Sequence, residues 1–176
     1  MIGDASDDPL APTRLTGWQW LRLVGNALNL TTPIGLLVAR IGQARIRRGP
    51  RGLVLAEGYR LPFPVAGAFT IGSVITTGTT FEERLRHLPR LLEHEERHSW
   101  QYLCCLGLPF YLFYVVMMGW SVLRTGDRAA RHAFERHAGL AIGGYRDLPI
   151  IPLSVQTRRA ATWLRLSLTG RGRRPR

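Results

Sequence analysis

The sequence predicts an α+β fold that is mostly helical, with a small antiparallel sheet placed before a charged helix. Three observations predict it: two apolar helical segments near the N-terminus, a following stretch rich in β-branched and aromatic residues, and helical spacing from about residue 80 onward. With 176 residues and 45% apolar composition, the chain has the size and composition of one globular domain. We expect this domain over residues 14–168, between a disordered lead at 1–13 and a basic disordered tail at 169–176.

The first two helices are expected near residues 15–28 and 33–46, where apolar residues are frequent and charges are sparse. Pro33 follows two threonines, which is the pattern of a threonine cap with a proline in the first helical turn. The second helix is expected to end in the basic loop around Gly49 and Pro50.

Two or three strands are expected in "GLVLAEGYRLPFP" and "GAFTIGSVITTG", which are rich in β-branched and aromatic residues and interrupted by Gly and Pro. Thr80, with Glu83 three residues later, is a capping-box signature for a helix that starts there. Pro89 is expected to open the next helix, which carries the charged sequence "LLEHEERH". The sheet therefore directly precedes this charged helix.

Further breaks are expected downstream of the charged helix. Gly107 and Pro109 are expected to end it, because proline disfavours helical geometry in the residue before it and lacks an N–H. New helices are then expected over 110–123, over 127–141 with an end at two glycines, and over the amphipathic stretch 154–168.

The formal net charge is +12, and all 24 basic residues are Arg. A GC-rich genome explains an all-Arg repertoire better than a selected nucleic-acid surface does. The Arg runs at 44–52 and 169–176 suit nucleic-acid phosphates and anionic lipid headgroups equally well. Because no nucleic-acid-binding motif accompanies them, we do not expect nucleic acid as a partner.

Cysteine usage and the N-terminal sequence bear on the compartment. Cys104 and Cys105 are adjacent, so they form neither a disulfide framework nor a CxxC metal or redox motif, and they suit a reducing compartment. The first residues are acidic and contain proline, with no basic segment followed by an apolar core, which argues against a secretory signal peptide. These features predict a cytoplasmic protein.

The charged helix contains two histidines with metal-ligand spacing. His94 and His98 are four residues apart and share one helix face, so both imidazoles can reach one tetrahedral zinc ion. Glu95 then lies near a zinc-bound water, whose pKa the ion lowers to about 7, and can act as the general base. In a random chain of this length with 5 His and 7 Glu, the pattern HExxH is expected about 0.006 times, so chance is a poor explanation for it. The exposed face of a charged helix remains the alternative.

A catalytic zinc ion requires a third protein ligand. The helix expected over 127–141 offers four candidates: Asp127, His132, Glu135 and His137. Glu135 is preferred, because the small residues Ala138 and Gly139 that follow it allow this helix to approach the first. His132 remains an alternative ligand, and both His132 and His137 remain open as ordinary surface residues.

The segments "LLEHEERHSWQY" and "FERHAGLAIGGY", joined by an apolar stretch, resemble the gluzincin type of HExxH zinc metallopeptidase, especially its small minimal members. The resemblance covers residues 65–145. It implies a zincin-like fold, Zn²⁺ held by His94, His98 and Glu135, and Glu95 as the catalytic base. Gln101 fills the position of a glutamine that often continues the family motif.

The same resemblance implies a peptide or protein substrate. The segment "FTIGSVITTG" resembles the edge strand that pairs with an extended substrate in this family, and such β-augmentation binds through main-chain hydrogen bonds. Two features depart from the family pattern. Gly139 stands where many members have an aspartate that supports a zinc histidine, and only Tyr145 and His137 are candidates for a transition-state residue. A catalytically inactive, membrane-associated or scaffold protein therefore remains the alternative to a hydrolase.

Residues 102–123 contain no charged side chain and form a candidate membrane span, since 22 helical residues extend about 33 Å. A span here would place His98 and Glu135 on opposite sides of the membrane. The two residues could then not bind the same zinc ion. A helix broken at Gly107 and Pro109 avoids this conflict and suits a buried core helix. Peripheral contact with a membrane surface remains open through seven aromatic residues: Trp18, Trp20, Phe110, Tyr111, Phe113, Tyr114 and Trp120.

Overall fold

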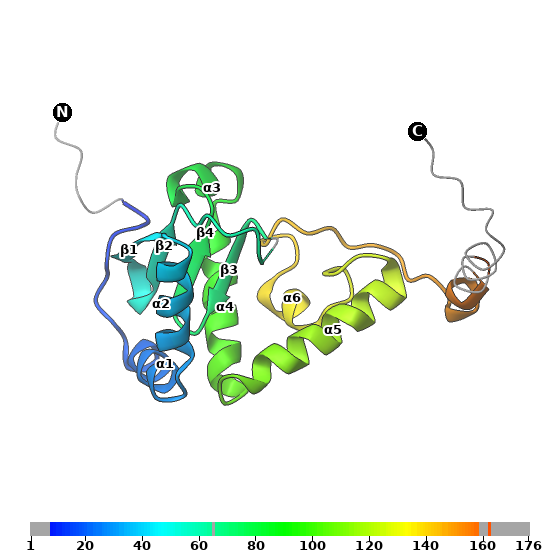
Figure 1. Ribbon diagram of the computed structural model, residues 1–176, viewed down its shortest axis with the longest axis horizontal. Helices are drawn as coiled ribbons and strands as arrows, with labels where there is room; N and C mark the ends of the chain where they lie inside the picture. Colours follow the sequence, from blue (N-terminus) through cyan, green and yellow to red (C-terminus); the bar gives the residue numbers. More distant parts are fainter. Residues whose placement is uncertain (1–7, 65, 159–161, 163–176) are drawn as a thin grey trace.

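The structure, a computed structural model, describes residues 8–64, 66–158 and 162. A small sheet lies between two helices, and a long helix extends to one side of this body (Figure 1). The predicted α+β class is confirmed. The basic tail at 169–176 and the first seven residues of the expected lead lie outside the described residues.

The two N-terminal helices are α1 (Gly17–Leu28) and α2 (Thr31–Ile41). Thr16 caps α1 through a complete capping box with Gln19, in which each side chain binds the backbone N–H of the other residue. Helix α2 starts two residues earlier than predicted and ends at Ile41 rather than at residue 46. It ends early because the chain turns at Gly42 and enters the sheet.

The sheet has four strands: β1 (Arg45–Arg48), β2 (Val54–Glu57), β3 (Ala68–Ile71) and β4 (Val74–Thr77). Their order is β1-β2-β4-β3, and a short 3₁₀ turn, η1 (Pro50–Gly52), joins the first two. Strands β2 and β4 run parallel, whereas the other two pairs are antiparallel. The predicted antiparallel sheet of two or three strands is therefore wrong in both strand number and strand direction.

Two physical causes explain this difference. Residues 45–48, expected to end the second helix and enter the basic loop, form the edge strand β1, because Arg45 and Arg47 bind the buried carboxylate of Glu57 on β2, at 3.3 and 3.2 Å. Strand β4 is buried along its whole length, and a strand covered on both faces suits a central position with a parallel neighbour. The hairpin β3–β4 thus adds to the sheet through β4 and leaves β3 at the edge.

Helices cover both faces of the sheet. Leu55 and Ile75 point to one face, where they form a core cluster with Phe81 and with Leu92 of the charged helix. Leu10 also belongs to this cluster, so part of the expected disordered lead packs against the domain. On the other face, the cluster of Ala39, Ala56 and Val74 packs α2 against the sheet. Each fully buried Leu or Ile contributes about 1.5–3 kcal/mol to this packing.

Helix α3 (Phe81–His87) and helix α4 (Leu91–Cys104) follow the sheet. As predicted, Thr80 caps α3, and its side chain accepts a hydrogen bond from the N–H of Glu83 at 3.2 Å. Helix α4 carries the HExxH sequence and begins at Leu91, two residues after Pro89.

Polar contacts fix α1 against α4. The buried Arg22 guanidinium binds Glu96 at 2.9 Å and lies 5.7 Å from the centre of the Trp100 ring. Asn26 donates hydrogen bonds to the backbone carbonyl and the hydroxyl of Ser99. The buried residues of α1 are thus polar, whereas most of its apolar side chains are exposed.

The chain bends by 119° between α4 and α5 (Pro109–Thr125), so the predicted break is confirmed. Helix α6 (Ala133–Ala138) is much shorter than the predicted 127–141. The Asp127 carboxylate accepts hydrogen bonds from the N–H groups of residues 129 and 130, which folds a turn there, and Gly139 with φ +95° ends the helix. Residues 153–158 are helical, and most of the rest of the predicted helix 154–168 lies outside the described residues.

Several helices leave large apolar side chains exposed, above all α1 and α5. Among the described residues, no single helix combines the length and the hydropathy needed to cross a membrane. The pairs α1 with α2 and α4 with α5 reach that hydropathy together, but each pair is bent, by 71° and 119°.

Candidate metal centre

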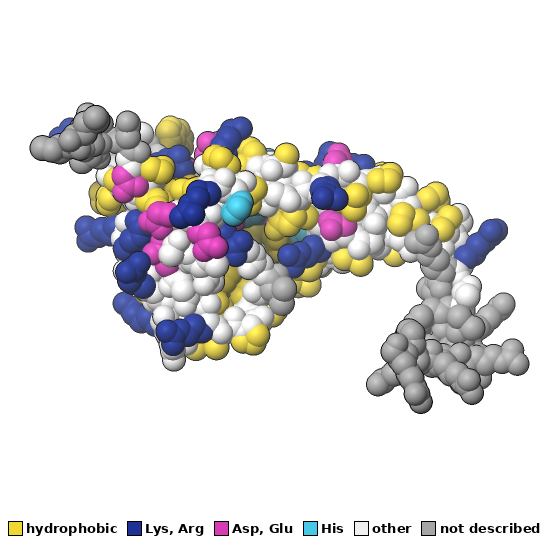
Figure 2. Space-filling view, turned by 90° about the horizontal axis from the view of Figure 1, so that it is seen from above, with side chains coloured by type: hydrophobic (Ala, Val, Ile, Leu, Met, Phe, Trp, Pro, Cys, Tyr) yellow, Lys and Arg dark blue, Asp and Glu magenta, His cyan; other side chains and the backbone are white. Residues whose placement is uncertain are grey.

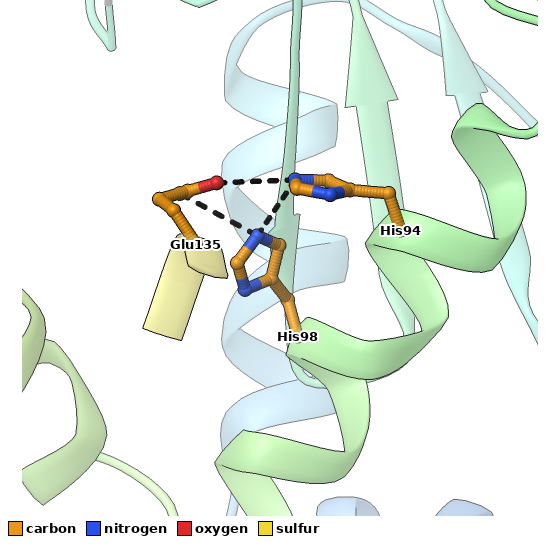
Figure 3. Close-up of side chains that lie close together, drawn as sticks. All are labelled: His94, His98 and Glu135. Atoms are coloured by element: carbon orange, nitrogen blue, oxygen red, sulfur yellow. Dashed lines mark hydrogen bonds and ion pairs between the residues drawn. The ribbon is translucent and has the colours of Figure 1, made fainter. Parts of the chain in front are cut away.

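His94, His98 and Glu135 converge at the junction of α4 and α6 (Figure 3). His94 and His98 lie one turn apart on α4, and Glu135 reaches them from α6. All three side chains are buried. The structure therefore brings together the three residues that the sequence predicted as metal ligands, although Glu135 lies 41 residues after His94 in the chain.

The distances between the donor atoms fit one small ion. The two Nε2 atoms are 3.1 Å apart, and they lie 3.2 Å (His94) and 3.5 Å (His98) from the nearest Glu135 carboxylate oxygens. Donors at about 2.0–2.1 Å from a tetrahedral zinc ion are separated by about 3.3 Å, along the edges of the tetrahedron. The observed separations are close to these edges, with Glu135 facing His94 through Oε2 and His98 through Oε1.

Hydrogen bonds determine which nitrogen of each histidine carries its proton. His94 Nδ1 lies 3.2 Å from the carbonyl oxygen of Gly139, which can only accept, so His94 Nδ1 donates. Gln101 donates from Nε2 to the carbonyl of Phe134, so its oxygen faces His98 Nδ1 at 2.8 Å and accepts from it. Both Nε2 atoms are therefore lone-pair acceptors, and they point at each other and at a carboxylate.

Only a positive charge makes this arrangement favourable. Burial on its own raises the pKa of Glu135, but the neighbouring imidazoles of His94 and His98 outweigh it and hold that pKa far below the ordinary value. Burial lowers the pKa of His98, and the neighbouring Glu135 more than reverses this and raises it. Glu135 Oε2 receives no hydrogen bond from the described residues. A shared proton or a metal ion satisfies these acceptors, and the donor set of two imidazoles and one carboxylate fits zinc.

Glu95 lies on α4 directly after His94 and is buried. Its Oε2 accepts a hydrogen bond of 2.7 Å from the hydroxyl of Thr70 on the edge strand β3. Among the described residues, no other donor binds this carboxylate. One oxygen of Glu95 is thus fixed by the sheet, and the other remains available for a proton.

The three other candidate site residues lie at different distances from the cluster. Gln101 contacts His98 directly and binds His137 Nδ1 on its far side, at 3.1 Å. His137 is exposed and is linked to the ligands only through Gln101. The Tyr145 ring lies 6.1 Å from the His94 ring, and burial followed by the Glu135 and Glu95 charges raises the pKa of its hydroxyl. Of the two proposed transition-state residues, Tyr145 is the one beside the centre.

The remaining ligand candidates serve the local structure instead. His132 is fully buried, so the surface alternative is wrong for it. Its Nε2 donates to the carbonyl of Tyr114 at 2.9 Å, and its Nδ1 caps α6 at the N–H of Glu135. Asp127 holds the turn before α6. Gly143 packs so closely on the His94 ring that a Cβ atom there would lie 2.5 Å from it.

Three contributions to the centre were not predicted from the sequence. The Tyr114 hydroxyl donates a hydrogen bond to Glu135 Oε1, and Thr70 holds Glu95. The Gly139 carbonyl orients His94 by accepting a hydrogen bond from its Nδ1. A backbone carbonyl leaves no trace in the sequence. The only sequence signal for Tyr114 is a polar group inside an otherwise apolar stretch.

Comparison with other proteins adds no assignment: no family model, no curated protein and no solved structure matches this chain. The description of the site therefore rests on its own geometry.

Proposed function

We propose that the chain is a zinc-dependent hydrolase with a zincin-like fold, most consistent with a peptidase. One observation carries the proposal. Three buried donors at tetrahedral separations, with both histidines oriented through Nδ1, lie next to a buried carboxylate that is not itself a donor of the cluster. A purely structural zinc site has four protein ligands, whereas three ligands and a neighbouring carboxylate are typical of catalytic sites.

The chain's own residues would divide the work as follows. His94, His98 and Glu135 would hold the ion, which when bound supplies a Lewis acid and lowers the pKa of water at the site. Glu95 would accept a proton on the oxygen that Thr70 leaves available and return it to the leaving group. Tyr145 would donate a hydrogen bond to the substrate carbonyl, because burial keeps its hydroxyl protonated.

The sheet edge supports an extended peptide as substrate. Strand β3 pairs only with β4 among the described strands, so its other edge offers unpaired N–H and C=O groups. Thr70 belongs to this strand and touches Glu95. A peptide added along β3 by β-augmentation would therefore pass the catalytic carboxylate.

Metal content and hydrolysis of a denatured protein, measured on the same variants, test this proposal. The wild type should carry one zinc ion per chain and cleave. Glu95→Gln should keep the zinc ion and lose cleavage, while His94→Ala and Glu135→Ala should lose both. Glu93→Gln, an exposed carboxylate of the same helix, is the matched control and should behave as the wild type.

Two results would contradict the proposal in different ways. Stoichiometric zinc with equal cleavage in the wild type and Glu95→Gln would favour the non-enzymatic alternative, a scaffold or membrane-associated protein that keeps the metal. Purified wild type that binds no zinc, even when zinc is added, would contradict both the enzyme and the metal-bound scaffold.

A further inference from the structure

The bend between α4 and α5 exposes a group of leucines. Leu28, Leu30, Leu106 and Leu108, which we name the elbow tip, are 78%, 59%, 81% and 54% exposed. They lie side by side, because a Cβ atom on Gly107 would lie about 3 Å from Asn29. Four leucines thus project from two adjacent turns at the end of the molecule opposite α3 (Figure 1).

Folding does not explain two of these leucines. Leu30 and Leu106 adopt left-handed backbone conformations, with φ of 67° and 59°. A leucine is strained there by its Cβ atom, whereas Gly or Asn fits. Neither side chain gains burial in exchange. Residues kept in strained conformations without a folding benefit point to a binding role.

The helices beside the elbow tip bury polar side chains and expose apolar ones. Helix α1 buries Arg22 and Asn26 and exposes Trp18, Leu21 and Leu28. Helix α5 buries two hydroxyl side chains among its three buried residues and exposes apolar ones. A helix surrounded by water shows the opposite arrangement, so the medium outside these helices is expected to be apolar.

Charge is distributed to match. Residues 98–123 contain no Asp, Glu, Lys or Arg, and the only charge between residues 15 and 39 is the buried Arg22. Seen from above in Figure 2, charged side chains are densest over the sheet-bearing body, and a few lie over the part that extends from it. The chain as a whole carries +12, which attracts it to an anionic surface.

We propose that the elbow tip inserts into one leaflet of an anionic lipid bilayer and holds the protein at the membrane surface. A bilayer suits the bent pairs α1–α2 and α4–α5, which have the hydropathy of membrane segments without the shape of a span. The exposed Trp18, Trp20 and Trp120 are the side chains that membrane interfaces favour, and Trp120 also stacks against Arg124. The metal centre is not needed for this binding.

Flotation of the full-length protein with lipid vesicles tests the proposal. Vesicles of equal parts phosphatidylcholine and phosphatidylglycerol should bind the wild type, and vesicles of phosphatidylcholine alone should bind it more weakly. The double variant Leu30→Asn/Leu106→Asn should reduce binding about tenfold or more, because two apolar side chains no longer enter the lipid. Asn suits the left-handed conformation, so this variant should fold and keep its zinc content.

Leu61→Asn is the matched control. This leucine is 44% exposed and lies beyond the far end of α2, since the neighbouring Arg60 N–H binds the carbonyl of Gly42. Its replacement should leave vesicle binding unchanged.

Three results would overturn the proposal. Wild-type protein that floats with neither kind of vesicle would contradict membrane binding. The double variant would bind as the wild type does if the Arg-rich tail alone made the contact. A wild-type dimer in size-exclusion chromatography that the double variant dissociates, without vesicle binding, would show that a second copy covers the elbow tip.

Discussion

The metal centre, which α4 and α6 form, and the elbow tip, which the α1–α2 and α4–α5 turns form, treat their side chains in opposite ways. At the centre, charged and polar groups are buried, and nearly every one has a partner. At the elbow tip, apolar leucines are exposed, and two of them are strained. The uncharged stretch 102–123 therefore contributes both to the buried metal centre and to an exposed apolar surface.

Helix α5 separates the two environments by periodicity. Phe110, Tyr114, Ser121 and Thr125 recur at helical spacing and face the protein, where Tyr114 reaches Glu135. Most positions between them up to Leu123 are exposed and apolar. Composition alone describes this helix as a membrane segment, whereas its inward stripe makes it part of the metal centre.

Loss of the metal should have the largest effect. Zinc at about a thousandfold above its Kd should stabilise the wild type by about 4 kcal/mol, and a chelator should remove this gain. Glu135→Ala should show no zinc-dependent shift in Tm, whereas Glu93→Ala should keep it, because Glu93 lies at the surface and pairs with Arg90 there. Equal zinc-dependent shifts in both variants would contradict the three-ligand site.

The next largest effect is expected from the polar inner face of α1. Arg22→Ala should lower the free energy of unfolding by about 3 kcal/mol, because it removes one partner of a buried ion pair. Arg124→Ala, which removes a partly exposed guanidinium from the Trp120 ring, should cost less than about 1 kcal/mol. Urea unfolding of both variants measures the difference, and similar losses would show that α1 is not held by its polar face.

A smaller effect is expected from removing the hydrogen bond between Gln101 and His98. Gln101→Ala should weaken zinc affinity about 10–100-fold, because His98 Nδ1 loses the acceptor that fixes its orientation. His137→Ala should weaken it less, since His137 touches only the far side of Gln101. Competition with a chromophoric chelator measures both affinities, and an unchanged affinity in Gln101→Ala would contradict the role of this hydrogen bond.

The pH dependence of the metal-free protein follows from the same contacts. The pKa of His98 is raised above 6.5, so its contribution to stability is complete below that pH and is lost as pH rises through the folded-state pKa. The pKa of Glu135 is lowered below 4.5, so its contribution is present above that pH and is lost on acidification. The metal-free protein should therefore be most stable between these two values.

With zinc bound, stability should rise rather than fall as the pH increases above this range, because the ion replaces the proton that His98 otherwise holds. Urea unfolding at several pH values, with zinc and with a chelator, compares the two states. Metal-free stability that increases from about pH 6 to about pH 8 would contradict the assigned protonation of His98.

Local sequence signals predicted much of the fold. The Thr80 cap, the break at Gly107 and Pro109, and the HExxH face of α4 each depend on residues within one or two helical turns. The parallel pairing of β2 with β4 depends on contacts between strands about 20 residues apart, which no local pattern encodes. The sequence predicts Arg45 at the end of the second helix and Arg47 in the loop after it, because their partner Glu57 is adjacent only in the sheet.

The metal ligands could be predicted because each imidazole and carboxylate is a side chain with its own chemical signature. Their supports could not, since the Gly139 carbonyl is backbone and the Thr70 hydroxyl reaches Glu95 from another element. The helix 127–141 was predicted too long because Asp127 satisfies the N–H groups of a turn there. A short polar side chain that binds nearby backbone competes with helix formation.

The smallest predicted effect has the opposite sign to all the others. Leu30→Asn and Leu106→Asn should each raise the free energy of unfolding by about 0.5–1 kcal/mol, because Asn relieves the left-handed strain and no buried contact is lost. Leu61→Asn should give no gain, since Leu61 has no positive φ. Urea unfolding of the three variants decides the matter. A loss of stability in the first two would mean that these leucines serve the fold, and the contrast between the buried centre and the elbow tip would then be one of exposure alone.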